Sequence, residues 1–194
     1  MLKNLLYPKN IASGVGEVIY IALQSWFVSI AKSNTSIEIT DNHVFIEDKG
    51  FIQLRAAPQK NNASGKSSGE IGLNNTQYAI QGFIAGSYIE QHSLMKALMN
   101  KALIVIIPDS NNPNLFYQVG SEDLPAYIKN DFTTGTTKDG AKGYTIDASS
   151  SNSAFAIYIG SIAISPDEVS LLLSIMIDDI DYLVNELDEI IEIA

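Results

Sequence analysis

Short runs of β-branched and aromatic residues recur along most of this 194-residue chain, and polar turn sequences separate them. Residues 15–23, 37–40, 75–83 and 144–148 are among these runs, and several of them alternate between apolar and polar positions. Such alternation is typical of strands that bury only one face. Because short strands joined by turns bury their apolar faces by stacking in layers, the pattern predicts a mainly β fold, an antiparallel sandwich or barrel.

Within this body only residues 89–102 show a helical pattern. Apolar side chains recur there at steps of three and four residues, which places them on one face of a helix. These side chains are Leu94, Met95, Leu98, Met99 and Ala102. The continuous apolar run at residues 103–107 follows and is typical of a central strand. The body is therefore predicted to be α+β, with one helix flanking the sheets.

Two further segments are expected to shape the body. Residues 44–46 and 51–55 flank the turn sequence Asp48-Lys49-Gly50, so they are predicted to pair as a hairpin. Residues 56–70, rich in Asn, Ser, Gly and Lys, are predicted to form a flexible, solvated arm. A second polar segment at residues 131–143 is predicted to be a loop.

The arm contains Gly65-Lys66-Ser67, which resembles the end of a phosphate-binding loop. That loop also needs a glycine five residues before its Gly-Lys pair, together with a strand before it and a helix after it. Position 60 is a lysine, and neither flanking segment has the required pattern. We therefore assign these residues to the arm and expect no nucleotide site.

The C-terminal segment carries the strongest helix signal. Ser165-Pro166-Asp167-Glu168 combines a capping serine, a proline at the first helical position and a glutamate three residues after the cap. Apolar residues then recur with seven-residue spacing in a wide stripe. The stripe consists of Leu173, Met176, Ile177, Ile180, Leu183, Val184, Leu187, Ile190 and Ile191. The sequence thus predicts two parts, a β domain at 1–163 and an acidic amphipathic helix at 164–194.

Charge separates the same two parts. Nine acidic residues and no basic residue follow position 160, whereas the rest of the chain has a net charge of only −1. A helix with a purely acidic polar face gains no internal ion pairs, so it needs a surface that covers its apolar stripe. Three hypotheses are open: the stripe packs on its own domain, it docks on a second subunit or another protein, or the segment is a frayed tail.

Several kinds of site find no support in the sequence. The chain has no cysteine, which excludes disulfides, thiolate metal sites and cysteine nucleophiles. His43 and His92 lack further ligands at metal-binding spacing, and no serine has a recognisable histidine partner. No apolar run approaches the length of a membrane span. We expect no catalytic residue, no metal and no cofactor.

The order of elements in residues 13–164 resembles that of tail-tube-like structural proteins of tailed bacteriophages. The two most distinctive parts are an LIVIIPD run followed by LFYQVG, and a segment that reads NDFTTGTTKDGAKGYTI. The other matching parts are IYIA, YAIQGFI, LMKALMNK and FAIYIGSI. The resemblance covers about four-fifths of the chain and leaves out the acidic helix.

This resemblance implies a self-assembling virion protein. Such subunits form rings, commonly hexameric, by joining their sheets, and the rings stack into a tube that contacts DNA only by enclosing it. Other virion proteins are then partners, and the virion is the expected location. In the same arrangement the arm, with Lys60, Asn61, Asn62 and Lys66, is expected to reach an adjacent ring. The acidic helix also suits a head–tail connector, a tail-completion protein or a capsid decoration protein. Two alternatives outside this class are a binding module with a coiled-coil helix and an enzyme with an unrecognised site.

Overall fold

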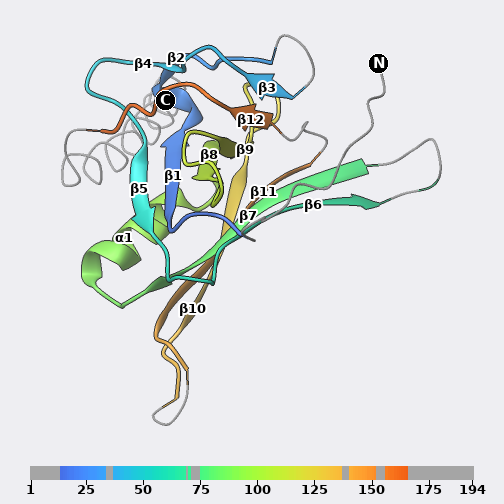
Figure 1. Ribbon diagram of the computed structural model, residues 1–194. Helices are drawn as coiled ribbons and strands as arrows, with labels where there is room; N and C mark the ends of the chain where they lie inside the picture. The colour runs from blue at the N-terminus through green and yellow to red at the C-terminus, as the bar shows by residue number, and fades with distance from the viewer. Residues whose placement is uncertain are drawn as a thin grey trace, which may run out of the picture.

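A computed structural model describes residues 14–33, 37–68, 70, 75–136, 140–151 and 156–165. Strands make up most of this part, in three sheets, with one α-helix and one short 3-10 helix (Figure 1). The mainly β fold that the sequence predicts is therefore confirmed. Of the predicted helix at 164–194, only Ile164 and Ser165 are described, and they are extended, with Ile164 bridged to Phe51; residues 166–194 lie outside the described residues.

The larger sheet has six strands in the order β3-β12-β9-β8-β1-β5. Neighbouring strands are antiparallel except β12 and β3, which are parallel. The strands are β1 Val18–Leu23, β3 Glu38–Ile39, β5 Ile52–Arg55, β8 Leu103–Pro108, β9 Phe116–Val119 and β12 Ala156–Tyr158. The sheet's centre is β8, whose first five residues are all buried, as its continuous apolar sequence predicts.

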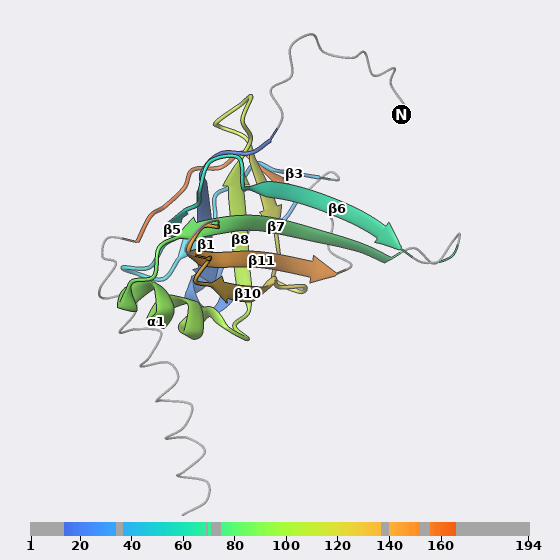
Figure 2. The ribbon, with the colours of Figure 1, turned by 90° about the horizontal axis from the view of Figure 1, so that it is seen from below.

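The second sheet has four antiparallel strands in the order β10-β11-β7-β6. They are β6 Asn62–Ser68, β7 Asn75–Ala85, β10 Tyr127–Thr133 and β11 Gly143–Ser151. In Figure 2 this sheet runs across the direction of β8 and β1, and the pair β6–β7 extends well past them. A small third sheet pairs β2 Phe27–Ser29 with β4 Val44–Phe45, directly after the 3-10 helix Gln24–Trp26.

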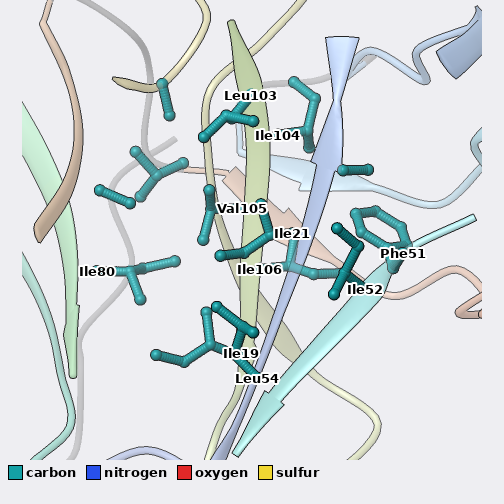
Figure 3. Packing of buried hydrophobic residues seen from close by; sticks show 14 of the residues in the cluster. Ile19, Ile21, Phe51, Ile52, Leu54, Ile80, Leu103, Ile104, Val105 and Ile106 are labelled. Carbon is teal, nitrogen blue, oxygen red and sulfur yellow. The ribbon is translucent and has the colours of Figure 1, made fainter. Parts of the chain in front are cut away.

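The core lies between the two larger sheets. Ile19 and Ile21 of β1 face it together with residues of β8, while Ile80 approaches from β7 (Figure 3). Ile146 of β11 is also fully buried in this cluster. Alternate residues of β7 and β11 point into the core, so the four-stranded sheet keeps its other face outside.

Helix α1 spans Ile89–Leu98 and buries Met95 and Leu98 against this core. The helix begins where Gln91 accepts a hydrogen bond from the Tyr88 N–H (3.2 Å). It ends four residues before the predicted boundary because Met99 is extended and Asn100 has a positive φ of 61°. The flanking position that the sequence predicts is confirmed (Figure 1).

The predicted hairpin between residues 44–46 and 51–55 is wrong. Strand β4 pairs with β2, whereas β5 pairs with β1. The turn between them instead carries the chain from the small sheet to the large one. Phe51 is fully buried there, and its N–H donates to the Ala163 carbonyl at 2.8 Å. The burial of Phe51, together with the pairing of its backbone with residues 163–165, therefore overrides the local turn signal.

Both polar segments contain more strand than expected. Residues 62–68 of the arm form β6, and residues 131–133 of the predicted loop belong to β10. Strand β10 was missed because only Ile128 in it is buried, so its apolar alternation is weak. These two strands are the outer members of the four-stranded sheet. Both obtain their order from pairing with inner strands rather than from their own composition.

Candidate assembly surface

The four-stranded sheet ends in two edges of equal length. Strands β6 and β10 are each seven residues long and lie at opposite sides of the sheet. No strand among the described residues pairs with the outer side of β6. An edge with unpaired N–H and C=O groups is a template for pairing with another chain. The unpaired backbone groups along these edges are therefore the most prominent candidates for a contact with another molecule in the described part of the chain.

The sequence Gly65-Lys66-Ser67 lies in β6, a strand paired with β7, and not in a loop between a strand and a helix. Gly65 is directly opposite Tyr78 on β7. A Cβ placed on Gly65 would stand only 2.5 Å from the Tyr78 ring, so the ring lies across the glycine. This glycine therefore serves cross-strand packing, in which an aromatic ring covers the gap that the missing side chain leaves.

The four predicted arm residues fall into two groups. At the base of the arm, the Lys60 Nζ lies 5.9 Å from the centre of the Phe83 ring, and the Asn61 amide donates to the Gly16 carbonyl at 2.9 Å. Both side chains are thus engaged with the body. Asn62 and Lys66 are exposed on β6 itself. This second pair lies on the edge strand itself.

The outer face of the sheet is mainly polar, apart from the buried Phe83 and the half-exposed Tyr127. Its side chains come from alternate positions of all four strands, as the cross-strand pairs define. They include Asn62, Ser64, Lys66, Ser68, Gln77, Gln81, Lys129, Asp131, Thr133, Thr145, Asp147 and Ser149. The Gln81 amide donates to Asp147 at 2.8 Å across two strands. Two lysines and two aspartates balance one another within this group, so the face is hydrophilic and nearly neutral.

Helix α1 covers part of the β10 edge. Met99, just after the helix, forms a parallel bridge with Ile128, and the Asn130 amide donates to the Met95 carbonyl at 3.0 Å. The edge therefore opens at Lys129 and continues to Thr133. Phe132 on this stretch keeps 41% of its surface exposed, although it points to the core side of the sheet.

A serine and a histidine meet beside this edge, a pairing that the sequence did not indicate. The Ser87 hydroxyl lies 2.9 Å from the His92 Nε2, and the His92 Nδ1 is hydrogen-bonded to the Tyr144 hydroxyl. The His92 ring also contacts Phe132 edge-on, with ring centres 4.9 Å apart. These contacts tie α1 to β10 and β11. The group that orients His92 is the phenol of Tyr144. In enzymes with a serine nucleophile, the histidine that activates the serine is usually oriented by a carboxylate.

His43 lies in a separate buried network. Its Nδ1 accepts the Ala31 N–H at 3.1 Å, so its proton resides on Nε2, which donates to the side-chain oxygen Oε1 of Gln118 at 3.0 Å. The ring stacks on Tyr158 at 4.5 Å. Burial holds the pKa of His43 below its usual value, and the Gln118 hydrogen bond opposes this shift only partly. His43 is therefore a neutral residue of the core.

Other candidate sites add little. Among the described residues no group of His, Asp and Glu has the arrangement of a metal site. No helix within the described part is long and apolar enough to cross a membrane. The nine residues of the predicted partner-binding stripe, Leu173 to Ile191, lie outside the described residues. A shallow hollow beside Gln24 and Lys101 is open to solvent and has no convergent ionisable pair.

Comparisons with protein-family models, with curated proteins and with solved structures found no match to this chain.

Proposed function

We propose that this protein is a non-enzymatic structural subunit of a phage virion that assembles into a ring of the tail-tube type. The observation that carries the proposal is the pair of open edges, β6 and β10, on one four-stranded sheet. The order of elements in the sequence, which resembles that of tail-tube-like proteins, supports the same assignment. No catalytic residue is required for this role.

Strand direction favours closure into a ring. Because the sheet is antiparallel and has an even number of strands, its two edges run in opposite directions. Copies related by rotation about one axis then bring β6 of one subunit beside β10 of the next in antiparallel orientation. Such head-to-tail contacts close into a ring when the rotation divides a full turn. The antiparallel pattern continues through every subunit.

The polar outer face suits the inside of such a ring. Its hydroxyl and amide side chains keep it hydrated, while its nearly neutral charge neither attracts nor strongly repels a phosphate backbone. DNA enclosed by the ring would then pass without a specific contact. A hexamer is the arrangement that the resemblance implies, and it would form a closed sheet from six copies of β6, β7, β11 and β10.

We extend the proposal to the acidic segment 164–194. Its apolar stripe, from Leu173 to Ile191, would form a helix that docks on a neighbouring subunit or another virion protein. Deletion of residues 166–194 should change the oligomeric state or reduce solubility in sedimentation experiments. The variant Ile177→Glu/Val184→Glu should reproduce this effect, whereas the matched variant Asp181→Asn should not. An equally soluble truncated protein of unchanged size would contradict a docking role.

Sedimentation of edge variants tests the ring itself. The variant Ser64→Lys/Ser68→Lys adds charge beside Lys66 on β6, and should shift the protein from rings to monomers. The control Ser151→Lys adds one charge at the end of the inner strand β11 and leaves both edge strands unchanged, so its rings should persist. Rings that survive the β6 substitutions would contradict edge-to-edge assembly. A head–tail connector or tail-completion protein is the second candidate, because the acidic helix offers a contact beyond the ring.

A further inference from the structure

We propose a specific register for the contact between subunits: Asp131 of β10 lies directly opposite Lys66 of the next copy's β6. This inference rests on the proposed ring, and it identifies which residues of a second copy of this chain would occupy the open edge of β10. Neither side chain has an ion-pair partner among the described residues.

The faces of the two strands restrict the choice of register. On β10 the residues Lys129, Asp131 and Thr133 point to the outer face, whereas on β6 the even-numbered residues do so. Antiparallel pairing between copies must place outer residues opposite outer residues, because a slip of one residue would turn a strand's side chains to the wrong side. Allowed registers therefore differ in steps of two residues.

One of these registers is selected by two criteria, the charges of opposing side chains and the part of β10 that Met99 leaves open. End-to-end pairing of the two seven-residue strands would place Lys129 opposite Lys66 of the next copy, and like charges directly opposite are unfavourable. A shift by two residues in one direction would place Tyr127 opposite Lys66. That register would pair Ile128 with the next copy, although Met99 already bridges to Ile128 within the subunit. The shift in the other direction uses only the open stretch from Lys129 to Thr133.

The selected register also gives each exposed side chain a suitable neighbour. On the outer face Asp131 meets Lys66, while Lys129 and Thr133 meet serines. Those serines are Ser68 and Ser64 of the next copy. On the core side the half-exposed Phe132 meets Gly65, beside the Tyr78 ring that already lies across that glycine. The contact thus combines an ion pair, hydrogen-bonding groups and an aromatic contact within five residue pairs.

The geometry of a closed sheet agrees with this register. Thr133 aligns through β11 with Ala85 of β7, whereas Ser64 aligns with Ala79. From one copy to the next, the proposed contact therefore shifts the register along the strands by six residues, the separation of Ala79 and Ala85. One copy spans four strand spacings across the sheet. With the usual rise and strand spacing, this displacement gives a strand tilt of about 45°, the upper end of the range for barrels. The tilt does not depend on the number of subunits.

Cysteine cross-linking tests the register directly, because the chain contains no cysteine of its own. Directly opposite positions of antiparallel strands have the Cα separation that a disulfide requires. The variant Lys66→Cys/Asp131→Cys should form a ladder of covalent oligomers on oxidation of assembled protein. The matched variant Lys66→Cys/Lys129→Cys should form at least tenfold less. Rings in which only the second variant cross-links, or neither does, would overturn the register and leave the proposed ring standing.

Charge reversal provides a second, independent readout. Lys66→Asp and Asp131→Lys should each shift the assembly midpoint to higher protein concentration, and the double reversal should restore it. Single variants that assemble as the unmodified protein does would overturn the register, as would a double variant without rescue. Failure of the unmodified protein to assemble at any concentration would instead overturn the proposed function, and the register with it.

Discussion

Gly65 and Tyr78 are cross-strand partners, and the tyrosine ring occupies the space where a side chain at Gly65 would lie. This relationship explains why a glycine stands in the middle of an edge strand. It also gives Gly65-Lys66-Ser67 a place in a paired strand, where the sequence predicts a flexible arm. The edge strand that Tyr78 stabilises is the one we assign to contacts between subunits.

A double-mutant cycle measures this contact. Gly65→Ala forces the Tyr78 ring aside, so its cost should largely disappear when residue 78 is already alanine. We expect a coupling energy of about 0.5–1 kcal/mol between Gly65→Ala and Tyr78→Ala in urea unfolding of dilute protein. The same cycle with Ser64→Ala, on the opposite face of β6, should give a value near zero. Equal coupling in the two cycles would refute the packing argument.

Gly120 should be among the least tolerant positions of the chain. It has a φ of +96°, and a Cβ there would lie 2.5 Å from the Leu103 carbonyl oxygen. Gly120→Ala should therefore destabilise the fold by about 3 kcal/mol or more, since both backbone strain and a clash oppose it. Gly14 is a matched control, because its φ is +104° but its nearest contact is at 3.8 Å.

Backbone strain alone should cost about 1–2 kcal/mol in Gly14→Ala. Urea unfolding of the two variants provides the comparison. If Gly14→Ala destabilised the protein as much as Gly120→Ala does, the close approach of the Leu103 carbonyl would not be the cause.

His43 should make stability depend on pH in the acidic range. Burial lowers the folded-state pKa of His43 below the unfolded value of about 6.5, so the unfolded state binds the proton more readily. Stability is therefore fully present above pH 6.5 and falls as the pH drops toward the folded-state pKa. Each unit of pKa lowering corresponds to about 1.4 kcal/mol.

Urea unfolding between pH 4.5 and 7.5 tests this dependence. His43→Gln should lower stability at pH 7 and flatten the slope between pH 6.5 and 5. A slope that is unchanged in this variant would assign the pH dependence to other groups.

The Tyr158 hydroxyl should contribute measurably to the same region. It donates to the Ser161 carbonyl at 2.7 Å and accepts the His43 N–H. Tyr158→Phe leaves the buried His43 N–H and the Ser161 carbonyl without this partner, and we expect a loss of about 1–3 kcal/mol in thermal or urea unfolding. Tyr127→Phe, at a half-exposed position, should have little effect, and a similar loss in both variants would contradict this assignment.

The sequence pattern predicts those elements that bury many of their own apolar side chains. The run Leu103–Pro108 is apolar throughout because β8 lies in the middle of the larger sheet. Helix α1 has its apolar residues on one face because only that face meets the core. In both cases the local sequence contains the information that defines the element.

The assembly edges could not be found in this way. Strands β6 and β10 hold few buried side chains, so their order depends on partners far away in the sequence. Likewise, the turn at Asp48-Lys49-Gly50 has the same local chemistry whether the chain turns back or crosses to another sheet. Only the burial of Phe51 distinguishes the two outcomes.

The central claim is that β6 of one subunit continues the sheet of the next through β10. Cryo-electron microscopy of the protein at its highest attainable concentration tests this claim most directly. We expect closed rings or stacked rings in which one antiparallel sheet passes through every subunit. Particles in which both edges face solvent, or single molecules alone at millimolar concentration, would contradict it.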